Sequence, residues 1–386
     1  MDRYARGSHE FRELVGGDPA TALAAIRRQS PEMFQTLIET GFAGQMTRAE
    51  LSRQWRELAT VAMLAAIGGA EPQLATHVHA ALRNGVSPDE LRALAEHVTG
   101  YAGFPRGLNA LRVIDEAITA ADLPAPAGRR AVRLPTHDTQ VASRGESGPP
   151  VLLIHAIGLD WRMWDAVMEP LSRGRRVYAY DVRGHGAASD TKVSTMDELA
   201  DDATRILDAL DIDTAHVVGL SYGGGIAQAL AVGHRDRLAS LALLGTTDTV
   251  FDAFAARAAA AETETTDTRV ATTLPRWFTT DALALNEFPV RYAREHLRRA
   301  LPTDFAGAWR AFQTLDVRDR LADLAVPVLV AAGENDVSCP PELMRAIAER
   351  IPGSVYKELA GAPHMMSLQS PDTVAAALEE FLPAES

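Results

Sequence analysis

Cysteine and lysine are nearly absent from this chain of 386 residues. The single cysteine, Cys339, excludes an intrachain disulfide framework and any metal or redox site built on paired cysteines. Lysine occurs only as Lys192 and Lys357, so almost all positive charge is arginine, whose planar guanidinium suits carboxylate binding. No apolar run reaches the roughly 20 residues of a membrane span, and the start MDRYARGSHEFREL lacks the apolar core of a signal peptide. We therefore expect a cytoplasmic protein without a membrane partner.

The remaining composition is that of a globular protein. Hydrophobic residues make up 47% of the chain and charged residues 23%, which is typical of folded domains. The length exceeds that of one ordinary domain, so two domains are expected. A formal net charge of −13 disfavours nucleic acid as a partner.

The first 123 residues follow a helical pattern. Helix boundaries are marked by capping residues, glycines and prolines. They predict a cap at Thr47-Arg48-Ala49-Glu50 before an apolar run that ends at Gly68, then helices from about Pro72 to Arg83, from Ser87-Pro88-Asp89-Glu90 to Tyr101, and from Gly103-Phe104-Pro105 to about Ala121. We expect an all-α domain over residues 1–123 and a linker rich in proline and glycine over residues 124–130.

From residue 131 to 386 the pattern changes to short apolar runs that alternate with helical stretches. The runs are Val151 to Ile154, Val177 to Tyr180, His216 to Gly219, Leu241 to Leu244 and Val326 to Val330. Fully apolar strands separated by helices predict a parallel sheet with both faces covered. Residues 130–146 are typical of an edge hairpin, and residues 247–318 predict a helical lid inserted between two strands.

Gly219-Leu220-Ser221-Tyr222-Gly223 matches G-x-S-x-G between a predicted strand and a predicted helix. The glycines permit a sharp turn that presents the hydroxyl of Ser221. Asp336 follows the next-to-last predicted strand and His364 follows the last, which gives the order expected for a nucleophile, an orienting acid and a general base. We predict that Ser221, His364 and Asp336 form a catalytic triad, with Asp248 left as an alternative acid.

An oxyanion requires two backbone N–H donors. We expect one from Tyr222, directly after the nucleophile, and one from Ile157 in the loop His155-Ala156-Ile157-Gly158 after the first central strand. Cys339 has no partner that supports a nucleophilic role, so we interpret it as an unreactive small residue.

Four further segments carry a resemblance to a known family. They are Met163-Trp164-Asp165, the run Tyr180 to Gly186, Arg276-Trp277-Phe278 and the run Gly333 to Pro340. With them, residues 131–384 resemble an α/β-hydrolase and, within that superfamily, the 3-oxoadipate enol-lactonases. The resemblance implies cofactor-free hydrolysis of a small-molecule lactone or ester, with Trp277 of the lid in contact with the substrate. Met365-Met366-Ser367 departs from the family's usual polar run after the histidine, which leaves the substrate open.

The first domain resembles a second family. Residues 33–118 are similar to 4-carboxymuconolactone decarboxylase, through the segments Glu71 to His77, Ala81 to Val86 and Tyr101 to Pro105. The resemblance implies a decarboxylation that needs neither cofactor nor metal, because the lactone carbonyl accepts the electrons. Related peroxidase-like proteins use a C-x-x-C pair, which this domain lacks.

The same resemblance implies roles for four side chains of the first domain. His77 would deliver a proton to carbon, Arg56 would bind a substrate carboxylate, and Tyr101 would stabilise the dienolate. His97 lies one helical turn from Tyr101 and is a further candidate for substrate contact.

The two resemblances describe consecutive reactions, because decarboxylation produces the enol-lactone that the hydrolase opens. We therefore predict a bifunctional enzyme of aromatic-compound catabolism in the β-ketoadipate pathway. Two alternatives stay open. The hydrolase could act on natural-product or xenobiotic esters beside a helical domain with another substrate, or the helical domain could serve only for oligomerisation. Because this fold usually assembles as trimers or hexamers, we expect a homo-oligomer formed through residues 1–123.

Overall fold

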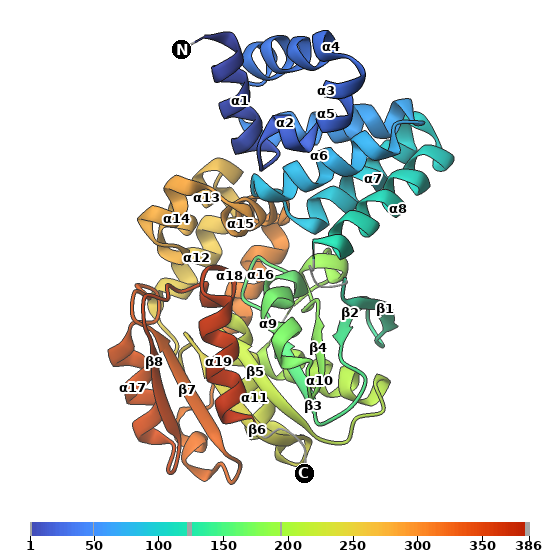
Figure 1. The fold of residues 1–386 in the computed structure, drawn as a ribbon. Helices are drawn as coiled ribbons and strands as arrows, with labels where there is room; N and C mark the ends of the chain where they lie inside the picture. Colours follow the sequence, from blue (N-terminus) through green and yellow to red (C-terminus); the bar gives the residue numbers. More distant parts are fainter. Residues whose placement is uncertain (1, 49, 122–125, 194, 383–386) are drawn as a thin grey trace. The chain divides into compact units, whose positions relative to one another are not determined.

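The computed structural model describes residues 2–48, 50–121, 126–193 and 195–382. The chain folds into two compact units, Met1–Pro126 and Ala127–Ser386. We call them the helical unit and the α/β unit (Figure 1). Among the described residues, no helix combines the length and the low polarity that crossing a lipid bilayer requires.

The described part of the helical unit contains helices and no strand, as the sequence predicts. In chain order they are α1 (Arg3–Leu14), α2 (Pro19–Ala22), α3 (Ala24–Gln29), α4 (Pro31–Thr36), the π-helix η1 (Leu37–Gln45), α5 (Arg53–Ile67), α6 (Glu71–Arg83), α7 (Pro88–Ala102) and α8 (Phe104–Ala120). Helices α5 to α8 share a core that includes Val78 and Ile114, whereas α1, α4 and η1 pack a second core around the rings of Phe11 and Phe42.

One of the two predicted helix caps is confirmed and the other is wrong. Ser87 and Glu90 form the reciprocal capping box of α7. Helix α5, in contrast, begins at Arg53 after Ser52, whose hydroxyl accepts a hydrogen bond from Trp55 N. Thr47 instead donates its hydroxyl to the carbonyl of Ala43, so the predicted cap lies too early in the chain.

The α/β unit contains one sheet of eight strands in the order β1-β2-β4-β3-β5-β6-β7-β8. The strands are β1 (Gly128–Arg133), β2 (Asp138–Arg144), β3 (Pro150–Ile154), β4 (Arg176–Tyr180), β5 (Ala215–Leu220), β6 (Leu238–Leu244), β7 (Val328–Gly333) and β8 (Val355–Leu359). Strands β1 and β2 form the predicted antiparallel edge hairpin, and β3 to β8 pair in parallel. Every residue of β5 and of β7 is buried, as expected for strands covered on both faces.

The expected linker, residues 124–130, overlaps the first strand. Residues 122–125 lie outside the described part of the chain, but Gly128–Arg130 pair with Val141–Ser143 as part of β1. The ladder hydrogen bonds available to this segment outweigh the turn-forming tendency of its composition.

Helices lie between the parallel strands and after the last of them. They are η2 (Trp161–Trp164), α9 (Asp165–Leu171), η3 (Gly186–Ala188), α10 (Met196–Ala209), α11 (Tyr222–Gly233), η4 (Arg235–Arg237), α17 (Pro341–Arg350), α18 (Met366–Gln369) and α19 (Pro371–Phe381). Between β6 and β7 the chain forms α12 (Asp252–Thr263), α13 (Thr266–Trp277), α14 (Thr280–Leu285), α15 (Phe288–Arg299), α16 (Pro302–Phe312) and η5 (Arg318–Asp323). Figure 1 shows helices α12 to α16 gathered beyond one end of the sheet, which is the position of a lid.

Candidate active sites

Ser221 lies on the turn between β5 and α11 with φ +56° and ψ −116°, a backbone conformation that side-chain-bearing residues rarely adopt. Its N–H donates to the carbonyl of Leu244 at 3.0 Å. The glycines two positions before and after Ser221 are required because a side chain there would clash with the backbone. A Cβ on Gly219 would lie 2.2 Å from the carbonyl oxygen of Gly223, and one on Gly223 would lie 2.1 Å from that of Ile154. The G-x-S-x-G pattern therefore encodes the tight turn that places the serine hydroxyl at the cavity.

The three residues expected to act together are in hydrogen-bond contact. His364 Nε2 lies 3.0 Å from Ser221 Oγ, and His364 Nδ1 lies 2.8 Å from Asp336 Oδ2. The other carboxylate oxygen of Asp336 accepts from the backbone N–H groups of Ser338 and Cys339 at 2.7 and 2.8 Å. An acceptor-only carboxylate on Nδ1 fixes the ring so that Nε2 accepts the serine proton. The side chains of Asp336 and His364 are buried, which excludes bulk water from both hydrogen bonds.

The alternative acid, Asp248, has a different partner. Asp248 follows β6 in the chain. Its carboxylate forms an ion pair with Arg350 at 2.7 Å and accepts a hydrogen bond from the hydroxyl of Thr249. The contact of His364 with Asp336 therefore excludes Asp248 as the orienting acid in this structure.

Both expected oxyanion donors lie beside the serine. Tyr222 is the first residue of α11, where backbone N–H groups have no intrahelical acceptor. Its ring is buried against Phe312 and His185, so only its backbone faces the site. Ile157, after β3, lines the same cavity as Ser221.

The cavity above Ser221 has a volume of about 780 Å³ and is walled mainly by the lid. Aromatic rings and hydroxyl groups dominate the wall, including Phe254, Trp309, Phe312, Thr247, Thr268, Thr272 and the predicted Trp277. The carbonyl of Trp277 accepts a hydrogen bond from Met365 N next to the catalytic histidine, which fixes this part of the lid. A cavity of this size accommodates a small-molecule ligand.

Two arginines of the lid face this cavity. Arg276 donates to Ser338 Oγ at 3.3 Å, and Arg257 lies over the ring of Trp309, 4.7 Å from its centroid. Burial, together with the charge of Arg276, lowers the pKa of Arg257 to about 10. Among the described residues Arg257 has no ion pair with a carboxylate, so its positive charge is uncompensated within the site.

The sequence analysis assigned no role to Arg257. It precedes an alanine-rich run and belongs to no motif, and only the packing of α12 against α16 brings it to the serine. Arg276 belongs to the Arg-Trp-Phe segment of the lid, from which only Trp277 was predicted to contact the substrate.

Among the described residues, Asp336, Cys339 and His364 bring potential metal-ligand atoms within 4.8 Å of one another. Asp336 and His364 are hydrogen-bonded to each other, so these ligand atoms already have a partner. Burial raises the pKa of the Cys339 thiol well above its usual value, and the two lid arginines lie close enough to act on it. Because neighbouring guanidinium groups repel a cation, this cluster is better suited to the triad than to a metal.

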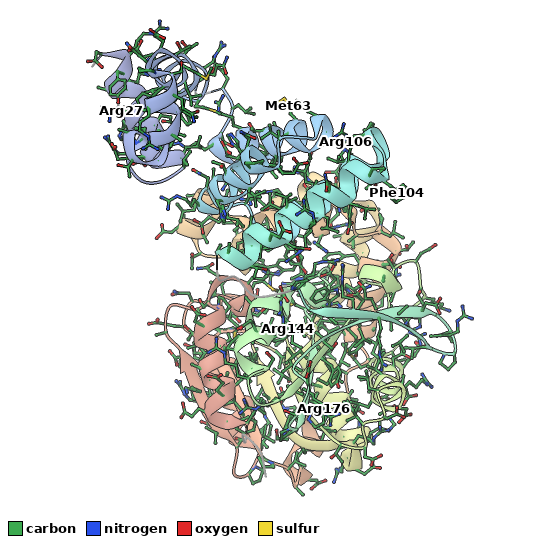
Figure 2. The ribbon with its side chains drawn as sticks, turned by 45° about the vertical axis from the view of Figure 1, so that its right-hand side comes forward. Arg27, Met63, Phe104, Arg106, Arg144 and Arg176 are labelled. Carbon is green, nitrogen blue, oxygen red and sulfur yellow. The ribbon has the colours of Figure 1, made fainter. Side chains whose placement is uncertain are left out.

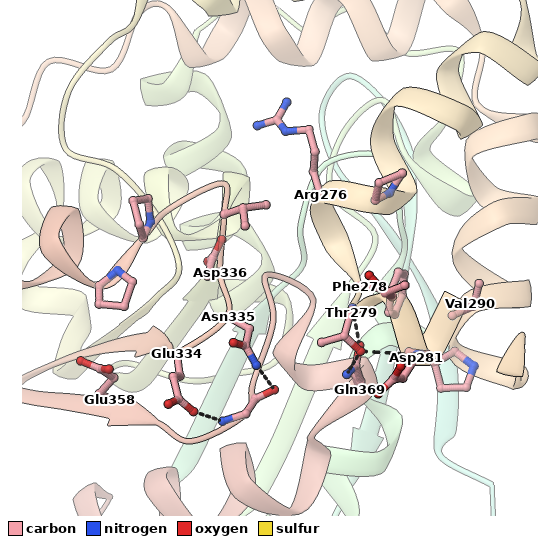
Figure 3. A pocket seen from close by; sticks show the side chains of 18 of the residues that line it. Arg276, Phe278, Thr279, Asp281, Val290, Glu334, Asn335, Asp336, Glu358 and Gln369 are labelled. Carbon is pink, nitrogen blue, oxygen red and sulfur yellow. Dashed lines mark hydrogen bonds between the residues drawn. The ribbon is translucent and has the colours of Figure 1, made fainter. Parts of the chain in front are cut away.

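A second cavity, of about 1260 Å³, lies between α14, α15 and the turns that follow β7 and β8 (Figure 3). Its wall carries carboxylates such as Asp281, Glu334 and Glu358, whereas Arg276 lines both cavities. At its edge the side chain of Gln369 exchanges two hydrogen bonds with Thr279, which ties the lid to α18. The acidic wall disfavours an anionic ligand in this groove.

Glu57 and His77 form an acid–histidine pair in the helical unit. His77 Nδ1, on α6, lies 2.7 Å from Glu57 Oε2, on α5. Glu57 is fully buried, and its second carboxylate oxygen has no hydrogen-bond partner among the described residues. The sequence analysis missed Glu57. A signal was present, because Glu57, Val61 and Ala65 form the buried stripe of α5 and a carboxylate in such a stripe needs a partner.

The other three residues predicted for this unit are placed differently. Arg56 donates to the backbone carbonyls of Gln45, Arg48 and Leu51, which gives it a structural role and argues against the expected carboxylate contact. The rings of His97 and Tyr101 on α7 lie with their centroids 5.0 Å apart and their planes tilted by 47°, and both side chains are exposed to solvent.

Each of the two units matches a known protein family. The profile of the α/β hydrolase fold matches residues 149–371, and the chain belongs to this family. The helical unit carries a domain of the carboxymuconolactone decarboxylase family, matched over residues 31–116.

Individual relatives match the α/β unit. The 3-oxoadipate enol-lactonase 1 of Acinetobacter baylyi is 29% identical over 229 residues, which are 59% of this chain and 86% of the relative. The crystal structure of the enol-lactonase from Burkholderia xenovorans LB400 superposes with a TM-score of 0.63 at 29% identity, covering 66% of this chain and 99% of that chain. A malate-bound thermophilic esterase from Thermogutta terrifontis gives a TM-score of 0.61 at 31% identity, over 66% of this chain and 98% of the esterase.

Proposed function

We propose that the α/β unit opens 3-oxoadipate enol-lactone to 3-oxoadipate by serine catalysis. The observation that carries this proposal is the Ser221–His364–Asp336 contact at the floor of a cavity that also holds two lid arginines. The relation to enol-lactonases supports the choice of a lactone over other esters.

The reaction proceeds in two steps. Ser221 Oγ attacks the lactone carbonyl while His364 Nε2 takes the hydroxyl proton, and the N–H groups of Ile157 and Tyr222 stabilise the oxyanion. The bond to the ring oxygen then breaks, and His364 returns the proton to that enol oxygen. A water molecule, deprotonated by His364, attacks the acyl-enzyme. The acid is released, Ser221 regains its proton, and the enol tautomerises to the ketone.

Arg257 and Arg276 select the substrate in this proposal. A carboxylate on the lactone side chain would pair with guanidinium groups that lack an acidic partner in the cavity, and Trp277 would pack on the ring. The esterase that binds malate supports an acid-binding cavity in a related fold.

We further propose that the helical unit decarboxylates 4-carboxymuconolactone. The pair of His77 and Glu57 supports this second activity. Because Nδ1 is committed to the carboxylate, His77 would transfer a proton to the dienolate carbon from Nε2. The breaking C–C bond leaves its electron pair on the lactone carbonyl, and no cofactor enters.

Self-association of the helical unit is also proposed. Six large apolar side chains of α5, α7 and α8 are each more than half exposed: Trp55, Met63, Ile67, Tyr101, Phe104 and Leu108. Figure 2 shows Met63 and Phe104 projecting from the surface of this unit. Burial between copies would remove this apolar surface from water.

The test measures CO2 release from 4-carboxymuconolactone and, in a separate assay, opening of 3-oxoadipate enol-lactone supplied as substrate. Ser221→Ala should lower the kcat of lactone opening by a factor on the order of 10⁶ and accumulate enol-lactone while CO2 release continues. His77→Ala should abolish CO2 release and spare lactone opening, with His79→Ala on the same helix as its control. More than a few per cent of residual opening in Ser221→Ala refutes the serine mechanism. A wild-type protein that opens the lactone without releasing CO2 favours the helical unit as an oligomerisation module.

A further inference from the structure

A single buried carboxylate joins the lid to the loop that carries the oxyanion donor. Asp160 lies three residues after Ile157, at the start of η2. Its Oδ1 accepts from the hydroxyl of Tyr292 at 2.8 Å, and its Oδ2 lies 2.9 Å from His296 Nε2. Tyr292 and His296 lie one turn apart on lid helix α15. Arg162 closes the cluster with an ion pair of 2.7 Å to Asp160 Oδ2.

The loop and the lid are also in steric contact. Gly158, directly after Ile157, has φ +74°, and a Cβ there would lie 2.9 Å from Phe305 and 3.3 Å from Leu297 of the lid. The backbone next to the N–H of Ile157 therefore lies close against side chains of α15 and α16.

The surroundings of His296 require both ring nitrogens to donate. Nε2 faces the carboxylate of Asp160, and Nδ1 lies 3.0 Å from the carbonyl oxygen of Tyr292. A neutral imidazole donates from one nitrogen only, so its second nitrogen would oppose an acceptor with a lone pair. The geometry thus favours the imidazolium.

The titratable groups around His296 agree with this. Burial disfavours its charge, but the hydrogen bond and the negative charge of Asp160 outweigh burial and raise the pKa of His296 above its usual value. Arg162 opposes the shift. On the far side of Asp160, burial lowers the pKa of His155 to about 3 and of His185 to about 4, so both are neutral near pH 7.

We propose that Asp160, held by Tyr292 and by protonated His296, positions the oxyanion loop, and that loss of the His296 proton loosens the lid and slows hydrolysis. These are positioning residues, since none of them touches the reacting atoms. The proposal rests on the serine hydrolase function of the α/β unit.

The direction of the pH effect follows from the raised pKa. The contact between protonated His296 and Asp160 is fully formed below the ordinary histidine pKa. It is lost as the pH rises through the pKa of His296 in the folded protein. The loss acts on the oxyanion, so kcat falls while KM changes little. A displaced oxyanion donor costs between about 10-fold and about 100-fold in kcat.

The test compares wild type with His296→Gln across the pH range. Gln keeps a donor but cannot carry the charge, so the ratio of wild-type to variant kcat should be largest at neutral pH and below, and should approach one at alkaline pH. His234→Gln is the matched control. His234 forms a similar pair with Asp201 at 2.8 Å, and neither residue lines the cavity above Ser221. The ratio of wild-type to His234→Gln kcat should therefore stay at one throughout the pH range. Tyr292→Phe should lower kcat by a factor independent of pH below the tyrosine's titration.

The rate at which a fluorophosphonate labels Ser221 gives a second readout, because the phosphoryl oxygen occupies the oxyanion site. The ratio of wild-type to variant labelling rates should match the ratio of kcat values, whatever the natural substrate is. If wild type itself is not labelled, the result counts against the serine hydrolase function. Equal kcat and labelling rates in wild type, His296→Gln and Tyr292→Phe overturn the proposal. So does a variant whose melting temperature falls while kcat at permissive temperature does not. If His296→Gln fails to fold, the proposal is tested with Tyr292→Phe and with histidine titration by NMR in Asp160→Asn. A His296 pKa that Asp160→Asn leaves unchanged also overturns the proposal.

Discussion

Replacing Arg257 by Met removes one cation from the catalytic cavity and keeps an unbranched apolar side chain over Trp309. A hydrogen bond to a charged group contributes about 1.5–3 kcal/mol, which corresponds to a loss of about 10-fold to about 150-fold in kcat/KM for a carboxylate-bearing lactone. Stability should not fall, because the guanidinium is partly buried without an acidic partner in the described structure, and its removal relieves repulsion from Arg276.

The assay measures kcat/KM for the free acid of the enol-lactone and for its methyl ester. Wild type should prefer the acid, and Arg257→Met should lose this preference while its activity on the methyl ester stays unchanged. Arg299→Met is the control for net charge, since Arg299 is an exposed lid residue whose nearest carboxylate, Glu295, lies 3.8 Å away. An equal loss on acid and ester would refute the anion-binding role and point to a general effect on the lid.

Three further predictions concern stability and assembly. Gly223→Ala places a Cβ 2.1 Å from the carbonyl of Ile154 and should cost about 1–3 kcal/mol and most activity, whereas Gly233→Ala, with no atom within 4 Å, should be neutral in thermal melting. Because His155 and His185 are buried and neutral, with pKa values of about 3 and about 4 against 6.5 when exposed, stability should decline as the pH falls below about 6.5. The loss at pH 5 is about 2 kcal/mol for each histidine, whereas Asp181, whose pKa burial raises to about 7, opposes the decline. The fall in urea-unfolding free energy from pH 7 to pH 5 should therefore be smaller in His185→Gln than in wild type, and an equal fall in both proteins would contradict it. Residues 1–126 expressed alone should form an oligomer by light scattering, and a monomeric fragment with native helicity would show that the exposed apolar residues do not mediate assembly.

The helical unit illustrates how far local signals reach. The capping box at Ser87 is confirmed because both of its hydrogen bonds join residues three apart in the chain. The same type of pattern at Thr47 failed, because η1 continues to Gln45 and the hydroxyl of Thr47 bonds back to Ala43. Glu57 was missed for a related reason. Its partner, His77, lies 20 residues away on the next helix, and only helix packing brings the two side chains together.

Local sequence patterns were sufficient to predict the α/β fold and the chain order of Ser221, Asp336 and His364. G-x-S-x-G sets the serine at the end of a strand, and parallel strands bring the residues that follow them to one edge of the sheet. Tertiary structure alone decided which acid reaches His364, since Asp248 also follows a strand but pairs with Arg350. It also decided that Arg257 faces the cavity. The physical reason is that strand ends are fixed by backbone hydrogen bonds, whereas the direction and partner of a charged side chain depend on helices packed from distant parts of the chain.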